Sequence, residues 1–103
     1  DRVSVRRVDE AAVQLVSMEQ QAVRRQHLET LLLAARLAAW RADAPAYAGS
    51  LREARDWVDR YYDARDARVQ ALARELESLA GAPVDAPLPD VSASLRLLRA
   101  GAP

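Results

Sequence analysis

The sequence contains no cysteine, no lysine and no phenylalanine, and His27 is its single histidine. The missing cysteine excludes disulfides, thiolate zinc sites, iron–sulfur clusters and a cysteine nucleophile. One histidine also excludes a metal site built from several histidines of one chain. We therefore interpret His27 as a surface or hydrogen-bonded side chain, and we predict no catalytic residue and no metal ligand.

Glycine and long apolar runs are equally scarce. Three isolated glycines, at 49, 81 and 101, form no glycine-rich turn that brings backbone N–H groups to a phosphate or to a methyl donor. The longest apolar run, 31–35, is far shorter than the ~20 residues that a membrane helix needs. No cofactor is evident from these residues, and the sequence itself contains no membrane span.

Neither sign of charge is in excess, because 15 arginines balance 15 acidic residues. This balance argues against nucleic acid or anionic lipid as a partner. What the chain does contain is alanine, at 22 of its 103 positions. Much alanine with little glycine favours close-packed helices over sheet. We expect a mainly α protein, a small helical bundle that forms one domain.

The first nine residues show a different pattern from the rest. Val3, Val5 and Arg7 alternate with the residues between them, and this period of two predicts a short β-strand in an N-terminal arm over 1–9. A lone strand leaves its backbone unpaired. We therefore expect it to pair with a second chain in a homodimer, through Val3, Ser4, Val5, Arg6 and Arg7.

The helical domain is predicted to cover 17–99. Ser17 followed by Gln20 is a capping-box pattern, Pro45 suits a first helical turn, Asp66 suits an N-cap, and Gly81 suits a C-cap. With the apolar periodicity, these signals predict three main helices and a short C-terminal fourth, over 18–42, 45–62, 67–80 and 91–99. The first two helices form an antiparallel αα-hairpin of tetratricopeptide-repeat length, but no second copy follows.

One cluster of side chains combines aromatic rings with guanidinium groups: Trp57, Arg60, Tyr61, Tyr62 and Arg65. Such groups hold a flat polycarboxylate by stacking and by charge-assisted hydrogen bonds. The alternative interpretation is that the aromatic residues fill the core and pack at the helix ends. We treat the cluster as a candidate surface for a ligand or a partner.

Several segments together resemble the HemX proteins. They include VSVRRVD at 3–9, LVSMEQ at 15–20, ARLAAWRAD at 35–43, YAGSLREARDW at 47–57 and RYYD at 60–63, with 87–90 and 94–95 fitting the end of the pattern. These proteins are commonly labelled uroporphyrinogen-III, or uroporphyrin-III, C-methyltransferases. The resemblance covers nearly the whole chain and implies a link to tetrapyrrole (haem) biosynthesis.

The resemblance also implies a place in the cell. Full-length members have one N-terminal membrane span, so we expect this chain to be the C-terminal soluble part of a protein anchored in a bacterial inner membrane. We expect it to lie on the periplasmic side.

Three functions remain open. We favour a non-catalytic scaffold or regulatory module that binds protein partners, among them haem-biosynthesis components. The second is a uroporphyrinogen-III C-methyltransferase that uses S-adenosylmethionine, as the family label states. The third is a tetrapyrrole-binding module. The glycine-poor helical sequence favours the first, because methyltransferases of that name use an α/β fold with glycine-rich loops.

Overall fold

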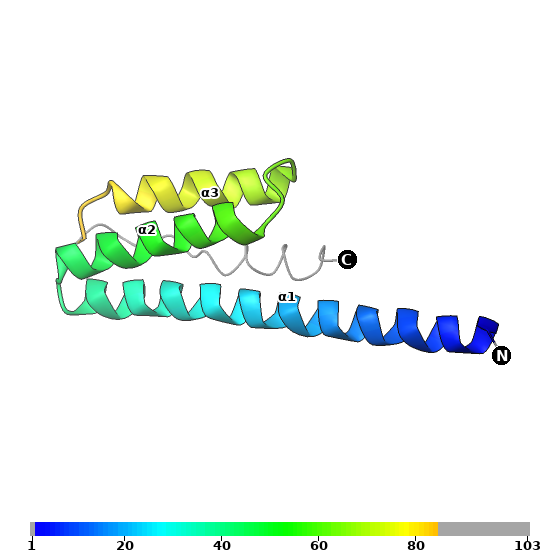
Figure 1. The fold of residues 1–103 in the computed structure, drawn as a ribbon. Helices are drawn as coiled ribbons and strands as arrows, with labels where there is room; N and C mark the ends of the chain where they lie inside the picture. Colours follow the sequence, from blue (N-terminus) through cyan, green and yellow to red (C-terminus); the bar gives the residue numbers. More distant parts are fainter. Residues whose placement is uncertain (1, 85–103) are drawn as a thin grey trace.

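A computed structural model describes the backbone of residues 2–84 and the side chains from Asp9 onward. It contains three helices in this range: α1 (Arg2–Trp40), α2 (Ala44–Tyr61) and α3 (Ala67–Ala80) (Figure 1). The prediction of a mainly helical protein is confirmed. The fourth helix predicted over 91–99 lies outside the described residues.

The N-terminal strand is a wrong prediction. Residues 3–7 belong to α1, which is helical from Arg2 and therefore begins well before residue 18. The physical reason is that a helix costs little to extend once it is nucleated, and no glycine or proline occurs before residue 44 to stop it. Because backbone groups of a helix bond within the helix, the reason for pairing this segment with a second chain as a strand no longer applies.

The corner between α1 and α2 is a tight one. Ala42 has φ 55°, in the left-handed region, and its N–H donates to the Ala39 carbonyl at 3.0 Å. The Asp43 N–H donates to the Ala38 carbonyl at 2.9 Å, which completes a Schellman motif at the end of α1. Asp43 is also the N-cap of α2, because its Oδ1 accepts from the Ala46 N–H at 3.2 Å. One residue thus closes α1 and opens α2.

The connection from α2 to α3 also depends on aspartates. Asp63 Oδ1 accepts from the Arg65 N–H at 2.9 Å, and Asp66, the N-cap of α3, accepts from the Arg68 N–H at 2.8 Å. Gly81 caps the far end of α3. The observed α2 and α3 lie within one residue of the ranges that these signals predict.

The core lies on both sides of α2, which packs against α1 on one side and against α3 on the other (Figure 1). Small residues allow α1 and α2 to approach closely, because Ala35, Ala38 and Ala54 are each at most 2% exposed. The buried residues are Leu28, Ala35, Ala38, Tyr47, Leu51, Ala54, Val58, Val69, Leu72, Ala73, Leu76 and Leu79. All of them are hydrophobic, and no polar or charged side chain described here is fully buried.

The N-terminal half of α1 projects beyond the other helices (Figure 1). At 1.5 Å per residue its 39 residues extend about 58 Å, whereas the 18 residues of α2 extend about 27 Å. Every residue from 9 to 20 is exposed. This part of α1 nevertheless carries large apolar side chains, and the exposed ones are Val13, Leu15, Val16, Met18 and, one turn further on, Val23. No helix in residues 2–84 combines the length and the apolarity needed to cross a bilayer.

Candidate functional site

Four side chains form an aromatic–arginine cluster where α2 ends beside the middle of α1. Trp57 and Tyr61 are one turn apart on α2, and their ring centroids are 4.3 Å apart. From α1, the His27 ring lies 4.1 Å from the Trp57 ring, and the Arg24 guanidinium lies 5.0 Å from the centre of the Tyr61 ring. We call Arg24, His27, Trp57 and Tyr61 the aromatic–arginine cluster from here on.

Trp57 connects the two helices of this cluster. Its Nε1–H donates to the main-chain carbonyl of Arg24 at 3.0 Å, and its ring is half-buried between those of His27 and Tyr61. A buried indole normally finds such a partner. Trp57 therefore fixes the position of α2 along α1, whereas Tyr61, 37% exposed, presents an aromatic surface to solvent.

The other three residues predicted for this site make none of the ring contacts that define the cluster. Arg60 is exposed on α2, one position before Tyr61. The Arg65 side chain is 92% exposed and turns back to Asp63 at 3.2 Å, so it belongs to the α2–α3 turn. That main-chain and side-chain bonding from Arg65 lowers the pKa of the Asp63 carboxyl.

Tyr62 is the third of these residues, and it lies on the same side of the hairpin. It is half-buried, and burial raises the pKa of its phenol, while the charges of Arg25 and Arg24 oppose that rise. Tyr62 therefore faces the same stretch of α1 as the cluster.

Sequence reasoning missed the α1 side of the site. Arg24 and His27 are one turn apart, and the only local signal for them is this spacing. Their contact with Trp57 and Tyr61 depends on how far α2 slides along α1. The alternative expected for the aromatic residues also has support, because Trp57 packs against the core.

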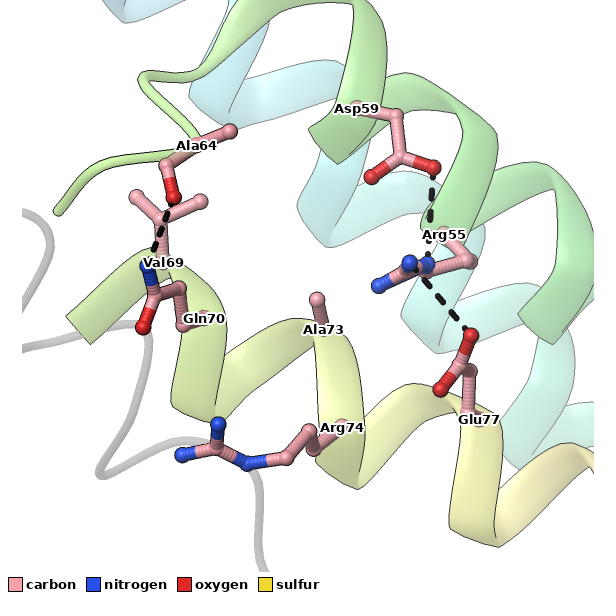
Figure 2. A pocket seen from close by; sticks show the side chains of 8 residues that line it. All are labelled: Arg55, Asp59, Ala64, Val69, Gln70, Ala73, Arg74 and Glu77. Carbon is pink, nitrogen blue, oxygen red and sulfur yellow. Dashed lines mark hydrogen bonds and ion pairs between the residues drawn. The ribbon is translucent and has the colours of Figure 1, made fainter. Parts of the chain in front are cut away.

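A second feature is an open hollow of about 290 Å³ between α2 and α3. Figure 2 shows Arg55 of α2 between two carboxylates, at 3.5 Å from Asp59 on its own helix and 3.3 Å from Glu77 on α3. Gln70 donates to the Ala64 carbonyl at 2.8 Å. The ion pair between Arg55 and Glu77 joins α2 to α3 and adds a little to their contact. The hollow itself is shallow, so it offers little to a small-molecule ligand.

Comparison with known proteins identifies the family. A family model described as "HemX, putative uroporphyrinogen-III C-methyltransferase" matches residues 1–101. The chain belongs to the HemX family. Family membership associates the chain with tetrapyrrole biosynthesis and confirms the resemblance noted in the sequence. Neither a curated protein nor a solved structure matches it.

The geometry of the HemX chain limits the chemistry that its described part can support. No group of three or more His, Asp or Glu side chains in that part is placed to hold a metal ion. Within the hollow, Arg55 is paired with Asp59 and Glu77, and the ring of the single histidine packs against Trp57. The surfaces that stay open are the aromatic–arginine cluster and the exposed apolar residues of α1.

Proposed function

We propose that this HemX domain is a non-catalytic scaffold or regulatory module of tetrapyrrole biosynthesis, which acts by binding a protein partner along the αα-hairpin. The observation that carries the proposal is a strip of exposed residues on α1. Val13, Val16 and Val23 are 68, 53 and 63% exposed. Their spacing continues to His27 and so leads along one side of the helix into the aromatic–arginine cluster.

Such a strip has the properties of a helix face that docks into an apolar groove of a partner. Apolar positions at helical spacing are the anchors of helix-in-groove recognition, and tyrosine, tryptophan and arginine are the residues most enriched where binding energy concentrates. We call Val13, Val16, Val23, His27 and Tyr61 the partner strip. Exposed Arg60 at its edge favours a partner that carries carboxylates.

The proposal is tested by site-specific photo-crosslinking in cells. A crosslinking residue replaces Val16 in the full-length protein, and an equivalent residue replaces Arg74 on α3 as the control. We expect Val16 to crosslink to an enzyme of tetrapyrrole biosynthesis, identified by mass spectrometry, and Arg74 not to do so. Products at Val16 that contain no enzyme of this route would contradict the proposal.

A second candidate function is tetrapyrrole binding, and the position of Arg24 favours it. Its guanidinium lies over the Tyr61 ring, and Arg60 is the next residue of α2. A guanidinium group over an exposed aromatic ring, with a second exposed arginine on the same turn of α2, suits the carboxylates and the flat ring system of a porphyrin.

Calorimetry with uroporphyrin III and with S-adenosylmethionine separates these functions from catalysis. Binding of both compounds supports the methyltransferase. Binding of uroporphyrin alone supports the tetrapyrrole-binding module, and binding of neither compound supports the scaffold. If uroporphyrin binds, Arg24→Ala with Arg60→Ala should weaken it at least about tenfold. Arg52→Ala, another exposed arginine of α2, is the control and should leave the affinity unchanged.

We also propose that the full protein is held at a bacterial inner membrane by a span that precedes this region, with this domain on the periplasmic side. The resemblance to HemX proteins supports this proposal. Protease treatment of spheroplasts tests the side, because a periplasmic domain is digested without lysis and a cytoplasmic one is protected.

A further inference from the structure

A second apolar strip lies on the side of α1 that faces away from α2. The buried residues Leu28, Ala35 and Ala38 mark the side packed on α2. At 100° per residue, Leu15 and Leu33 point about 140 to 160° away from this side. The large exposed side chains on or beside this line are Leu15, Met18, Leu33, Leu37 and Trp40, which are 60, 61, 54, 41 and 76% exposed. We call these five, with Ala22, the outer seam.

The outer seam is apolar at both ends and polar in the middle. Gln26 and Glu29 occupy the middle of the line, and Glu19 and Arg36 lie within the two apolar ends. The seam therefore has the same order of segments from either end: an apolar segment with one charged residue, a polar segment, and a second apolar segment with one charged residue. A pattern of this kind matches itself when two copies of the helix run in opposite directions.

One antiparallel register satisfies both bulk and charge. When residue i of one copy lies opposite residue 55 − i of the other, Leu15 meets Trp40, Met18 meets Leu37 and Ala22 meets Leu33. Apolar side chains then face each other in all three pairs, and the small Ala22 faces the large Leu33.

The same register pairs the charges. It places Glu19 opposite Arg36 and Glu29 opposite Gln26, and each pair occurs twice because of the two-fold symmetry. A parallel, in-register pair would instead place Glu19 on Glu19 and Arg36 on Arg36, which is repulsive.

We propose that the partner of the outer seam is a second copy of this chain, packed antiparallel along α1 about a two-fold axis between residues 27 and 28. The five large side chains of both copies would bury on the order of 1,000 Å², about the lower limit of a specific interface. The helices α2 and α3 lie on the opposite side of α1, so they leave the approach open (Figure 1). The partner strip stays outside the interface.

The primary test is sedimentation equilibrium of the full 103-residue chain from micromolar to millimolar concentration. We expect a reversible monomer–dimer equilibrium, which Leu33→Glu weakens at least about tenfold by placing a carboxylate against Ala22. Val13→Glu is the matched control, because it adds the same charge to the same helix away from the seam and should change the equilibrium less than about twofold. A chain that stays monomeric at every concentration would overturn the proposal. This holds also if the reason is that residues 85–103 of the same chain cover the seam.

Charge reversal tests the register without removing any apolar contact. Glu19→Arg alone and Arg36→Glu alone should each weaken the dimer, and the two together in one chain should restore it. Failure of the double variant to recover contradicts the pairing of Glu19 with Arg36. Circular dichroism establishes that each variant keeps its helices.

Engineered cysteines test the direction, because the native chain has none. We expect a mixture of Ala22→Cys and Leu33→Cys chains to form mainly the mixed 22–33 disulfide under mild oxidation. A majority of 22–22 and 33–33 disulfides would show a parallel dimer and reject the proposal.

Discussion

Ala42 occupies a backbone conformation that alanine rarely adopts. Its φ of 55° places it in the left-handed region, at the position of the Schellman motif where glycine is usual. The sequence predicts a break here from Asp43 and Pro45, but it gives no sign that an alanine takes the left-handed turn. The short connection and the packing of α1 on α2 impose this conformation, and no local pattern reports either of them.

We predict that Ala42→Gly stabilises the fold. The left-handed conformation costs a non-glycine residue about 1 kcal/mol, and glycine removes that cost, although it also loses more entropy on folding. The free energy of unfolding in urea should rise by up to about 1 kcal/mol. Ala34→Gly, in the exposed interior of α1, is the control and should lower it by about 1 kcal/mol. A loss of stability in Ala42→Gly would show that the turn is not under this strain.

The candidate site could be predicted on one helix only. Helical spacing places Trp57 and Tyr61 on one face of α2, and the structure confirms that they are in contact. Arg24 and His27 could not be added from the sequence, since their proximity to Trp57 depends on the relative position of two helices. The bond of Arg65 to Asp63 was not predictable either, because it belongs to the α2–α3 turn and depends on the backbone angles there.

At the scale of elements, the helices with clear terminal residues were the predictable ones. Asp43 and Asp66 act as N-caps and Gly81 as a C-cap, so the ends of α2 and α3 follow from residues that satisfy free backbone groups. The start of α1 was not predictable in this way. Its residues 9–20 are all exposed, so no buried face distinguishes them. The alternation of Val3, Val5 and Arg7 with the residues between them gave the wrong answer for the start of the chain.

The cap of α3 should make stability depend on pH in the acid range. The side-chain bond from Arg68, at 2.7 Å, and its backbone N–H lower the pKa of Asp66 to about 2. An unfolded aspartate has a pKa of about 3.9, so the folded state favours the ionised form. The stabilisation is complete above the unfolded pKa and is lost as the pH falls through the folded one.

Asp66→Asn isolates this charge, because asparagine is also a good N-cap. The melting temperature of the wild-type chain should exceed that of Asp66→Asn by a constant amount above about pH 5. The difference should shrink between about pH 4 and pH 2. Asp56→Asn, at an exposed position of α2, controls for the loss of one negative charge. A difference that stays constant down to pH 2 would contradict the role of Asp66.

At the scale of the molecule, α1 is twice as long as its partner helix. The core begins at Leu28 on α1 and continues through α2 to α3, so the folded centre needs only the second half of α1. The alanine-rich composition did predict this close helical packing, with Ala35, Ala38 and Ala54 at the contact. It could not predict that the first half of α1 continues past α2 and α3, with every residue from 9 to 20 exposed.

We therefore predict that deletion of residues 1–20 leaves the rest of the fold intact. The free energy of unfolding, measured at concentrations where both proteins are monomeric, should change by less than about 1 kcal/mol, because every residue from 9 to 20 is exposed. Circular dichroism should lose helical signal in proportion to the residues removed. An unfolded or molten product would show that the projecting half stabilises the core.

The shared residue at the corner of α1 and α2 has a mechanical consequence. Because Asp43 ends α1 and begins α2, no flexible linker separates the two helices of the hairpin. A force applied at the N-terminal end of α1 is therefore transmitted as torque to α2 and α3, with the long helix as the lever. One residue inserted after Ala42 would make the connection between α1 and α2 flexible. It would uncouple the orientation of the two helices, even though every core side chain remained the same.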